Sequence, residues 1–197
     1  MSTRLDIPDL PDEQLAALAA REGSDGPAFV ALVQRYQERV WRICYKLLGE
    51  VHEAHDEAQE VLVRMFSHRA QFEGRSKYST WVHGIAVRTC LMVRRGRGRQ
   101  RKREAALAAQ IEPSHRAESS STDLSLDLMK MLDTLDEEDR AMLILKYAEE
   151  QTFEDLAESF GLSLSACKMR VRRACEKLKQ RFPDHRFGDS EPTNSDR

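Results

Sequence analysis

The chain has 197 residues, of which 32% are charged and 41% are hydrophobic, and its formal net charge is −2. This length suits one ordinary domain or two small ones. Proline and glycine are sparse and helix-forming residues abound, so we predict an all-helical protein. There is no signal-peptide apolar core at the N-terminus and no apolar run long enough to span a membrane, so we expect a cytoplasmic protein.

Charges of opposite sign are segregated along the chain. Residues 94–103 are almost entirely basic, residues 112–150 lean acidic, and a second basic run covers residues 168–181. A nucleic-acid-binding protein does not need a basic composition overall, because the placement of its charges decides where it binds. The two basic runs are therefore candidate phosphate contacts.

Four cysteines are present: Cys44, Cys90, Cys167 and Cys175. No pair has CxxC spacing, and each lies within a helical pattern. We interpret them as small buried hydrophobic residues in a reducing compartment, and redox sensing is the alternative.

Apolar residues spaced three and four apart predict four helices in the first part of the chain. They are a short helix that begins near Asp12, one from Pro27 to Gly49, one over about residues 53–70, and one that begins at Ser79. Asp12 and Ser79 are candidate N-caps, and Gly49 is a candidate C-terminal stop. The last helix runs into the first basic stretch.

Residues 104–122 are rich in Ala, Ser and Glu and are predicted to form a flexible linker. Four more helices are predicted after it: residues 123–134, 136–148, 152–160 and 163–182. In the first of these, the residues expected inside are Leu124, Leu128, Met131 and Leu132. Two small helical domains follow from this pattern, residues 12–103 and 123–182, and residues 183–197 are predicted to be a disordered tail.

The segment from Thr152 to Leu178 has the pattern of a helix-turn-helix. Thr152 and Ser163 can cap its two helices, and Gly161 stands at the turn. Lys168, Arg170, Arg172 and Arg173 lie on the second helix, which suits a helix that enters the DNA major groove. An ordinary basic, solvated face is the alternative interpretation.

A second signal combines aromatic and basic residues. Phe72, Tyr78 and Trp81 alternate with Arg75 and Lys77 just before the basic run. Aromatic rings among cations suit the binding of unstacked single-stranded bases, and a purely structural role in the core is the alternative.

At this point the chain resembles the extracytoplasmic-function sigma factors, the minimal two-domain class of bacterial sigma factors. The resemblance covers about residues 24–103 and 123–182 and rests on four motifs. Residues 54–61 resemble an acidic D-x-x-Q-E helix, residues 72–82 an F-x-G-x-S-x-F-x-T-W-L segment, and residues 152–158 and 165–171 the two helices of a −35-reading domain. The chain departs from the family pattern at Glu57, Tyr78, Thr89, Cys167 and Met169.

The resemblance implies a role for each motif. Asp56, Gln59 and Glu60 would dock on the clamp helices of RNA polymerase. The second motif would recognise the promoter −10 element and capture a flipped base, and the helix-turn-helix would read the −35 element. The predicted DNA-binding residues are Arg75, Lys77, Tyr78, Trp81, Arg88, Thr89, Arg94, Arg95, Thr152, Ser165, Lys168, Arg170, Arg172 and Arg173.

The expected partners are core RNA polymerase, promoter DNA and an anti-sigma factor, with no cofactor and no catalysis by the chain itself. Two alternatives stay open. A stand-alone helix-turn-helix regulator would leave the motifs of residues 53–82 unused. A helical metal-dependent hydrolase would use His52, His55 and Asp56, although the spacing of the histidines does not fit the metalloprotease pattern.

Overall fold

The computed structural model describes residues 7–23, 26–108 and 123–183, and every regular element in these ranges is a helix. The predicted all-α class is therefore confirmed. The first part of the chain contains η1 (Ile7–Asp9), α1 (Asp12–Ala19), α2 (Pro27–Leu48), α3 (Val51–Ser67), η2 (Arg69–Gln71) and α4 (Tyr78–Ala108). The second part contains α5 (Asp123–Leu132), α6 (Glu137–Ala148), α7 (Phe153–Phe160) and α8 (Leu164–Arg181).

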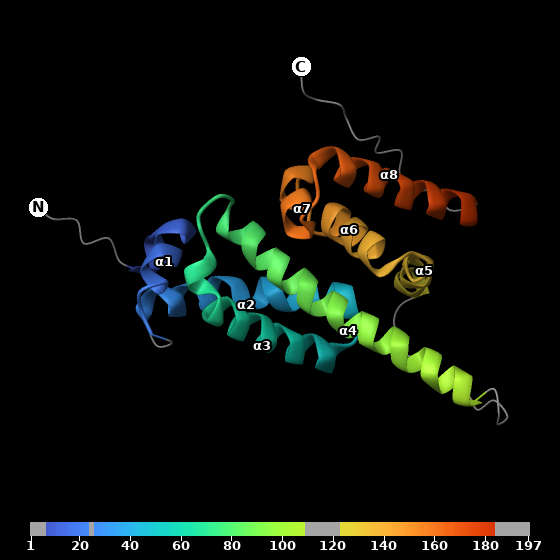
Figure 1. The fold of residues 1–197 in the computed structure, drawn as a ribbon, viewed down its shortest axis with the longest axis horizontal. Helices are drawn as coiled ribbons and strands as arrows, with labels where there is room; N and C mark the ends of the chain where they lie inside the picture. The colour runs from blue at the N-terminus through green and yellow to red at the C-terminus, as the bar shows by residue number, and fades with distance from the viewer. Residues whose placement is uncertain (1–6, 24–25, 109–122, 184–197) are drawn as a thin grey trace, which may run out of the picture.

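The first domain is a bundle of α2, α3 and α4, with α1 packed across one end (Figure 1). The apolar face of α2 recurs every three or four residues and is buried along its whole length. Pro27 opens this helix, and Gly49 ends it with a left-handed φ of 79°, as the sequence indicates. The predicted bounds of α2 are confirmed.

The second domain packs α6, α7 and α8 around a small core, with α5 at one end (Figure 1). Its fully buried side chains include Met142 and Leu145 on α6 and Leu156 on α7. In α5 the predicted inner residues Met131 and Leu132 are buried. Leu128 is 53% exposed, so its predicted burial is wrong. The side chain of Leu124 lies outside the described residues.

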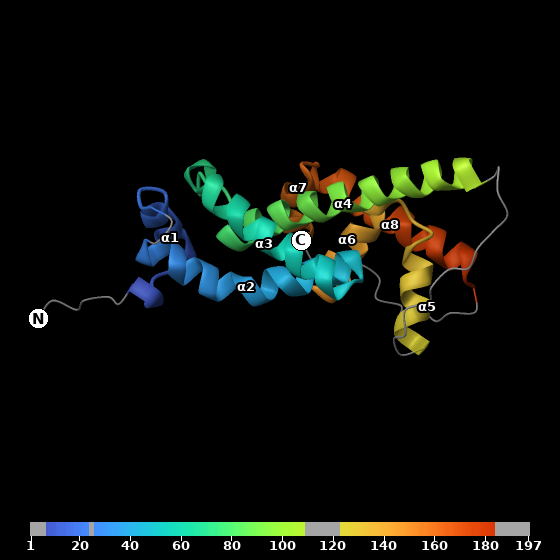
Figure 2. The same ribbon diagram turned by 90° about the horizontal axis from the view of Figure 1, so that it is seen from below.

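The two domains contact each other along α4. Helix α7 packs against α4, and α6 contacts both α4 and α2. Figure 2 shows α4 running past the ends of α2 and α3, beside the helices of the second domain. The chain therefore brings its two separated helical blocks into one interface, a feature that the sequence does not indicate.

Three helix starts differ from the sequence prediction. Asp12 does not cap α1, because it lies inside the first turn, where its carboxylate accepts from Arg35 at 2.5 Å. Helix α3 begins at Val51, where the Glu50 side chain accepts from two backbone N–H groups. Ser79 lies inside α4, and the Glu13 carboxylate accepts from the first backbone N–H of that helix, on Tyr78, at 3.3 Å.

Helix α4 also continues through Ala108, past residue 104, where the sequence placed the start of the linker. Residues 109–122 and the tail from residue 184 lie outside the described residues, so their predicted flexibility stays a prediction. Among the helices that the structure describes, none combines the length and apolar character needed to cross a membrane.

Candidate nucleic-acid interface

The helix-turn-helix forms through local signals. The Thr152 hydroxyl accepts from the backbone N–H of Asp155 at 3.1 Å and so caps α7. The Ser163 hydroxyl accepts from Ala166 at 3.2 Å and caps α8. Between them Gly161 adopts a left-handed φ of 65°, which a residue with a side chain adopts only at a cost. All three sequence predictions for this turn are confirmed.

The helices of this motif are held at a fixed angle by a small apolar core. Leu156 and Ala157 on α7 are buried, as are Cys167, Val171 and Ala174 on α8. This is the packing that the sequence predicts. Because one face of α8 is committed to the core, the opposite face is presented to solvent.

The exposed face of α8 is basic. Lys168, Arg172 and Arg173 are all exposed, and Arg172 pairs with Glu176 one turn away at 2.8 Å. Arg170 is different, because it is half-buried and donates to Asp139 at 2.6 Å and to Glu138 at 2.7 Å. Three of the four predicted cations are thus available to a ligand, and the fourth is held by acidic side chains of α6.

The three aromatic residues of the first domain form one cluster. The Tyr78 ring lies 5.1 Å from Phe72 and 5.4 Å from Trp81, measured between ring centroids. Tyr78 is only 1% exposed, whereas Phe72 and Trp81 are half-buried. Burial, and then the charge of Asp12, raises the pKa of the Tyr78 hydroxyl. In this conformation Tyr78 is therefore the buried member of the cluster, and Phe72 and Trp81 are its partly accessible members.

The predicted cations near this cluster in the sequence differ in exposure. Arg75 and Lys77 are exposed in the loop before α4, and Arg88 is exposed on α4 itself. Thr89 is 2% exposed and its hydroxyl has no partner in the structure, so it lies in the core rather than on the DNA-facing side. Arg94 is mostly buried by its acidic partners, and Arg95 is exposed but paired with Glu138.

The comparison with known proteins decides the family. Residues 32–100 match the family model Sigma-70 region 2, and residues 125–178 match Sigma-70, region 4. Together these segments span both helical blocks. The chain belongs to the extracytoplasmic-function class of the sigma-70 family.

Relatives of this sigma factor span most of its length. It is 26% identical over 175 residues to ECF RNA polymerase sigma factor SigW of Bacillus subtilis, which covers 81% of this chain and 91% of SigW. It is 28% identical over 165 residues to ECF RNA polymerase sigma factor SigE of Mycolicibacterium smegmatis, which covers 81% of this chain but 63% of that protein.

Among solved structures, the sigma factor RpoE in complex with the anti-sigma factor NepR from Bartonella quintana matches with a TM-score of 0.57 and 24% identity. The match covers 80% of this chain and 98% of that one. At this identity the likeness is one of fold.

The acidic helix α3 of this sigma factor lies on the outside of region 2. Asp56 and Gln59 are exposed, and Glu60 is half-buried and pairs with Arg64 at 2.7 Å. Glu57, the departure from the family pattern, is half-buried, and burial followed by the nearby Glu60 raises the pKa of its carboxyl. The three predicted docking residues thus share one accessible region.

The metal alternative finds no support in the part of the chain that the structure describes, since no group of three or more His, Cys, Asp or Glu side chains there is arranged to hold a metal ion. The ring of His55 instead lies 5.5 Å from the ring of Trp41. Cys44, Cys90 and Cys167 are buried and Cys175 is half-buried, as free thiols. The interpretation of the first three as core residues is confirmed.

Sequence reasoning missed four polar residues that form two pairs at the contact between the domains. Thr80 donates to Asp155 at 2.7 Å, and the buried His83 lies 2.5 Å from the side-chain nitrogen of Gln151. Burial lowers the pKa of His83 to about 4, with a smaller contribution from Arg39. The local sequence signal for this contact was the presence of Thr80 and His83 on a face of α4 that is otherwise apolar.

Proposed function

We propose that this sigma factor binds core RNA polymerase and directs it to promoters, acting in the cytoplasm without catalytic chemistry of its own. Its two reading modules would be residues 12–103 and 123–182, joined by residues 104–122. The observation that carries the proposal is the capped helix-turn-helix with an exposed basic face, preceded in the same chain by the region 2 bundle.

The −35 element is the proposed target of α8. Ser165, Lys168 and Arg172 lie on its exposed N-terminal half or near it, where a recognition helix meets base edges. Arg173 would contact phosphates, and the exposed Thr152 at the start of α7 is placed for the neighbouring backbone. Together they would read duplex DNA.

The −10 element is the proposed target of the aromatic cluster. Trp81 offers a partly exposed ring, and the exposed cations Arg75, Lys77 and Arg88 lie within ten residues of it in the sequence. Such a surface suits single-stranded bases in opened DNA. Tyr78 and Thr89 are buried here, so we assign them the positioning of that surface rather than a direct contact.

Polymerase is the proposed partner of α3. Asp56 and Gln59 are exposed on this helix, and Glu60, which is half-buried, pairs with Arg64 at 2.7 Å, so the three offer an acidic and polar surface. An anti-sigma factor is a further proposed partner, in keeping with the complex in which the similar RpoE was solved.

Run-off transcription tests the proposal. Purified core polymerase is combined with this chain on a library of promoter-bearing fragments, and transcripts are mapped. Discrete start sites that require the chain support the proposal. Binding of the chain to DNA as a dimer, with no start sites when only core polymerase is added, would favour the stand-alone regulator.

A further inference from the structure

The exposed face of α8 has a methionine near its centre. Cys167, Val171 and Ala174 of this helix are buried, so the opposite face is turned to solvent. At about 3.6 residues per turn, Met169 falls close to the middle of that opposite face. Its side chain is 45% exposed. Single exposed apolar side chains are common on protein surfaces, so a role for Met169 has to come from its surroundings.

The residues around Met169 on this face are polar or charged. Ser165 lies one turn before it, Arg172 and Arg173 lie one turn after it, and all three are exposed. Glu176, a further turn along, pairs with Arg172 at 2.8 Å and interrupts the cations of this face. The N-terminal half of α8 is therefore the stretch that suits a close approach of DNA, and Met169 lies in its middle.

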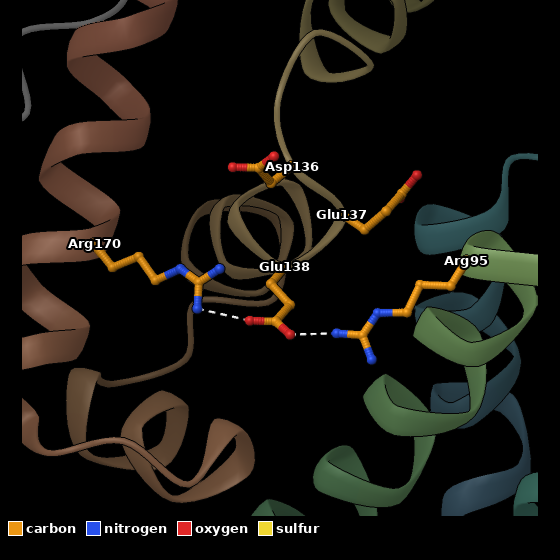
Figure 3. A pocket seen from close by; sticks show the side chains of 5 residues that line it. All are labelled: Arg95, Asp136, Glu137, Glu138 and Arg170. Carbon is orange, nitrogen blue, oxygen red and sulfur yellow. Dashed lines mark hydrogen bonds and ion pairs between the residues drawn. The ribbon is translucent and has the colours of Figure 1, made fainter. Parts of the chain in front are cut away.

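The neighbouring side of α8 already contacts α6. Figure 3 shows Arg170 directed toward Glu138 at the start of α6, with which it pairs at 2.7 Å. Arg170 also donates to Asp139 at 2.6 Å. These ion pairs hold that side of α8 within the domain, so a DNA duplex that approaches the helix meets the face that carries Met169.

A hollow between α8 and the start of α6 adjoins Met169. Its apolar lining consists of Leu162, Ala166 and Met169, and the rest of its lining is charged. Leu162 is half-buried, whereas Ala166 is exposed beside Met169. A small apolar group placed against these three side chains would be shielded from water, and its burial would stabilise the complex.

Duplex DNA presents one small apolar group in its major groove, the C5-methyl group of thymine. Cytosine carries only a hydrogen at that position, and the groove edges of adenine and guanine present polar atoms. Methionine suits contact with a methyl group because its side chain is unbranched, flexible and polarizable. Such a contact needs no hydrogen bond and distinguishes thymine from the other three bases.

We infer that Met169 is a specificity-determining residue, which selects a thymine of the −35 element through apolar contact with its C5-methyl group. This inference rests on the proposed function, since it takes α8 to enter the major groove of promoter DNA. Among the positions at which the chain departs from the family pattern, Met169 is the exposed one. It is therefore the departure that can directly change which promoters are read.

The test removes the methyl group from the DNA without changing its base pairing. Mapping the starts made by core polymerase with the full chain first locates the −35 element. Each thymidine of that element, on either strand, is then replaced singly by deoxyuridine. Competition binding of the holoenzyme gives the ratio of its affinities for the thymidine and deoxyuridine fragments. Because each ratio is taken within one protein, a partial loss of activity in a variant cancels.

Four proteins are compared: the wild type, Met169→Ser, Met169→Leu and Met92→Ser. Met92 is 55% exposed on α4, so Met92→Ser is a matched control for the same substitution. We expect the wild type to prefer thymidine about fourfold at one position, as the burial of one methyl group predicts. Met169→Ser should abolish this preference, Met169→Leu should keep most of it, and Met92→Ser should leave it unchanged.

Two kinds of failure can be told apart. Discrete starts support the proposed function, but the inference is overturned if the wild type binds both fragments equally at every position. A preference that persists in Met169→Ser, or a −35 element without thymine, would overturn it as well. If core polymerase with this chain gives no discrete starts, the proposed function fails and the inference fails with it.

Discussion

Acidification should destabilise the protein through His83. Its ring is 3% exposed and its hydrogen-bond partner is the Gln151 side chain of the other domain. Burial lowers the pKa of His83 from 6.5 to about 4, Arg39 on α2 lowers it further, and Glu149 and Asp155 oppose this less strongly. The folded protein therefore keeps this ring neutral at a pH where the unfolded chain already binds a proton.

The sign and size of the effect follow from linkage. Stability is fully present above about pH 6.5 and falls as the pH drops toward about 4, because the unfolded state binds the extra proton in that window. One pKa unit corresponds to about 1.36 kcal/mol, so lowering the pH from about 7.5 to about 5 should cost about 2 kcal/mol through this residue.

Two carboxyl groups also make stability depend on pH, one with the opposite sign to His83 and one in a lower pH range. Burial, and then the nearby Glu60, raises the pKa of Glu57. The contribution of Glu57 to the stability of the folded protein therefore increases as the pH falls. At Asp155 burial acts to raise the pKa, but hydrogen bonds from Thr152 and Thr80 outweigh it, and the net pKa is lowered. The protein therefore loses the stability that Asp155 contributes only when the pH falls below the ordinary pKa range of an aspartate. The contribution of His83 must therefore be isolated by substitution.

Denaturant unfolding of the wild type and His83→Gln at both pH values gives the contribution of His83 by difference. His68→Gln, at an exposed position after α3, serves as the control. We expect His83→Gln to lower stability at neutral pH but to lose less on acidification than the wild type does. Parallel losses in the wild type and in His83→Gln would refute the argument.

Three further outcomes are expected. Of the four thiols, we expect only Cys175 to react rapidly with a thiol reagent in the native protein, because the other three are buried. The Cys175 sulfur lies 3.8 Å from the Tyr147 hydroxyl. Rapid reaction of the buried thiols would contradict the structure. Lys168→Ala and Arg172→Ala should each weaken promoter binding of the holoenzyme about tenfold, whereas equal loss in a Lys179→Ala control would refute the groove assignment. Asp56→Ala should reduce co-purification with core polymerase without changing the helical circular dichroism, and undiminished co-purification would remove α3 as the docking site.

Several helix-terminal features with a local cause were predictable from the sequence, although the Glu50 cap of α3 was missed. Thr152 and Ser163 cap their helices through bonds to residues three positions on, and Gly49 and Gly161 adopt the left-handed backbone that ends a helix. Each of these depends on a few adjacent residues, so the pattern of the sequence suffices. The helix-turn-helix and its exposed basic face were correctly predicted for that reason.

Features that depend on partners far along the chain were not predictable. Ser79 looks like an N-cap, but Glu13 on α1 supplies the acceptor for the first backbone N–H of α4. Leu128 follows the apolar spacing of its helix and is nevertheless exposed. The contact between α4 and the N-terminus of α6 joins residues more than 40 positions apart, for instance Arg94 and Glu137, and no local pattern in the sequence indicates it.

We propose that core RNA polymerase and this chain together recognise promoters through α8 and the aromatic cluster of region 2. Transcription of genomic fragments with core polymerase, followed by mapping of the RNA 5′ ends, tests it most directly. We expect discrete starts that share a −10 and a −35 element, with the −35 preference relaxed by Lys168→Ala. Starts without a shared upstream sequence, or starts that do not require the chain, would contradict it.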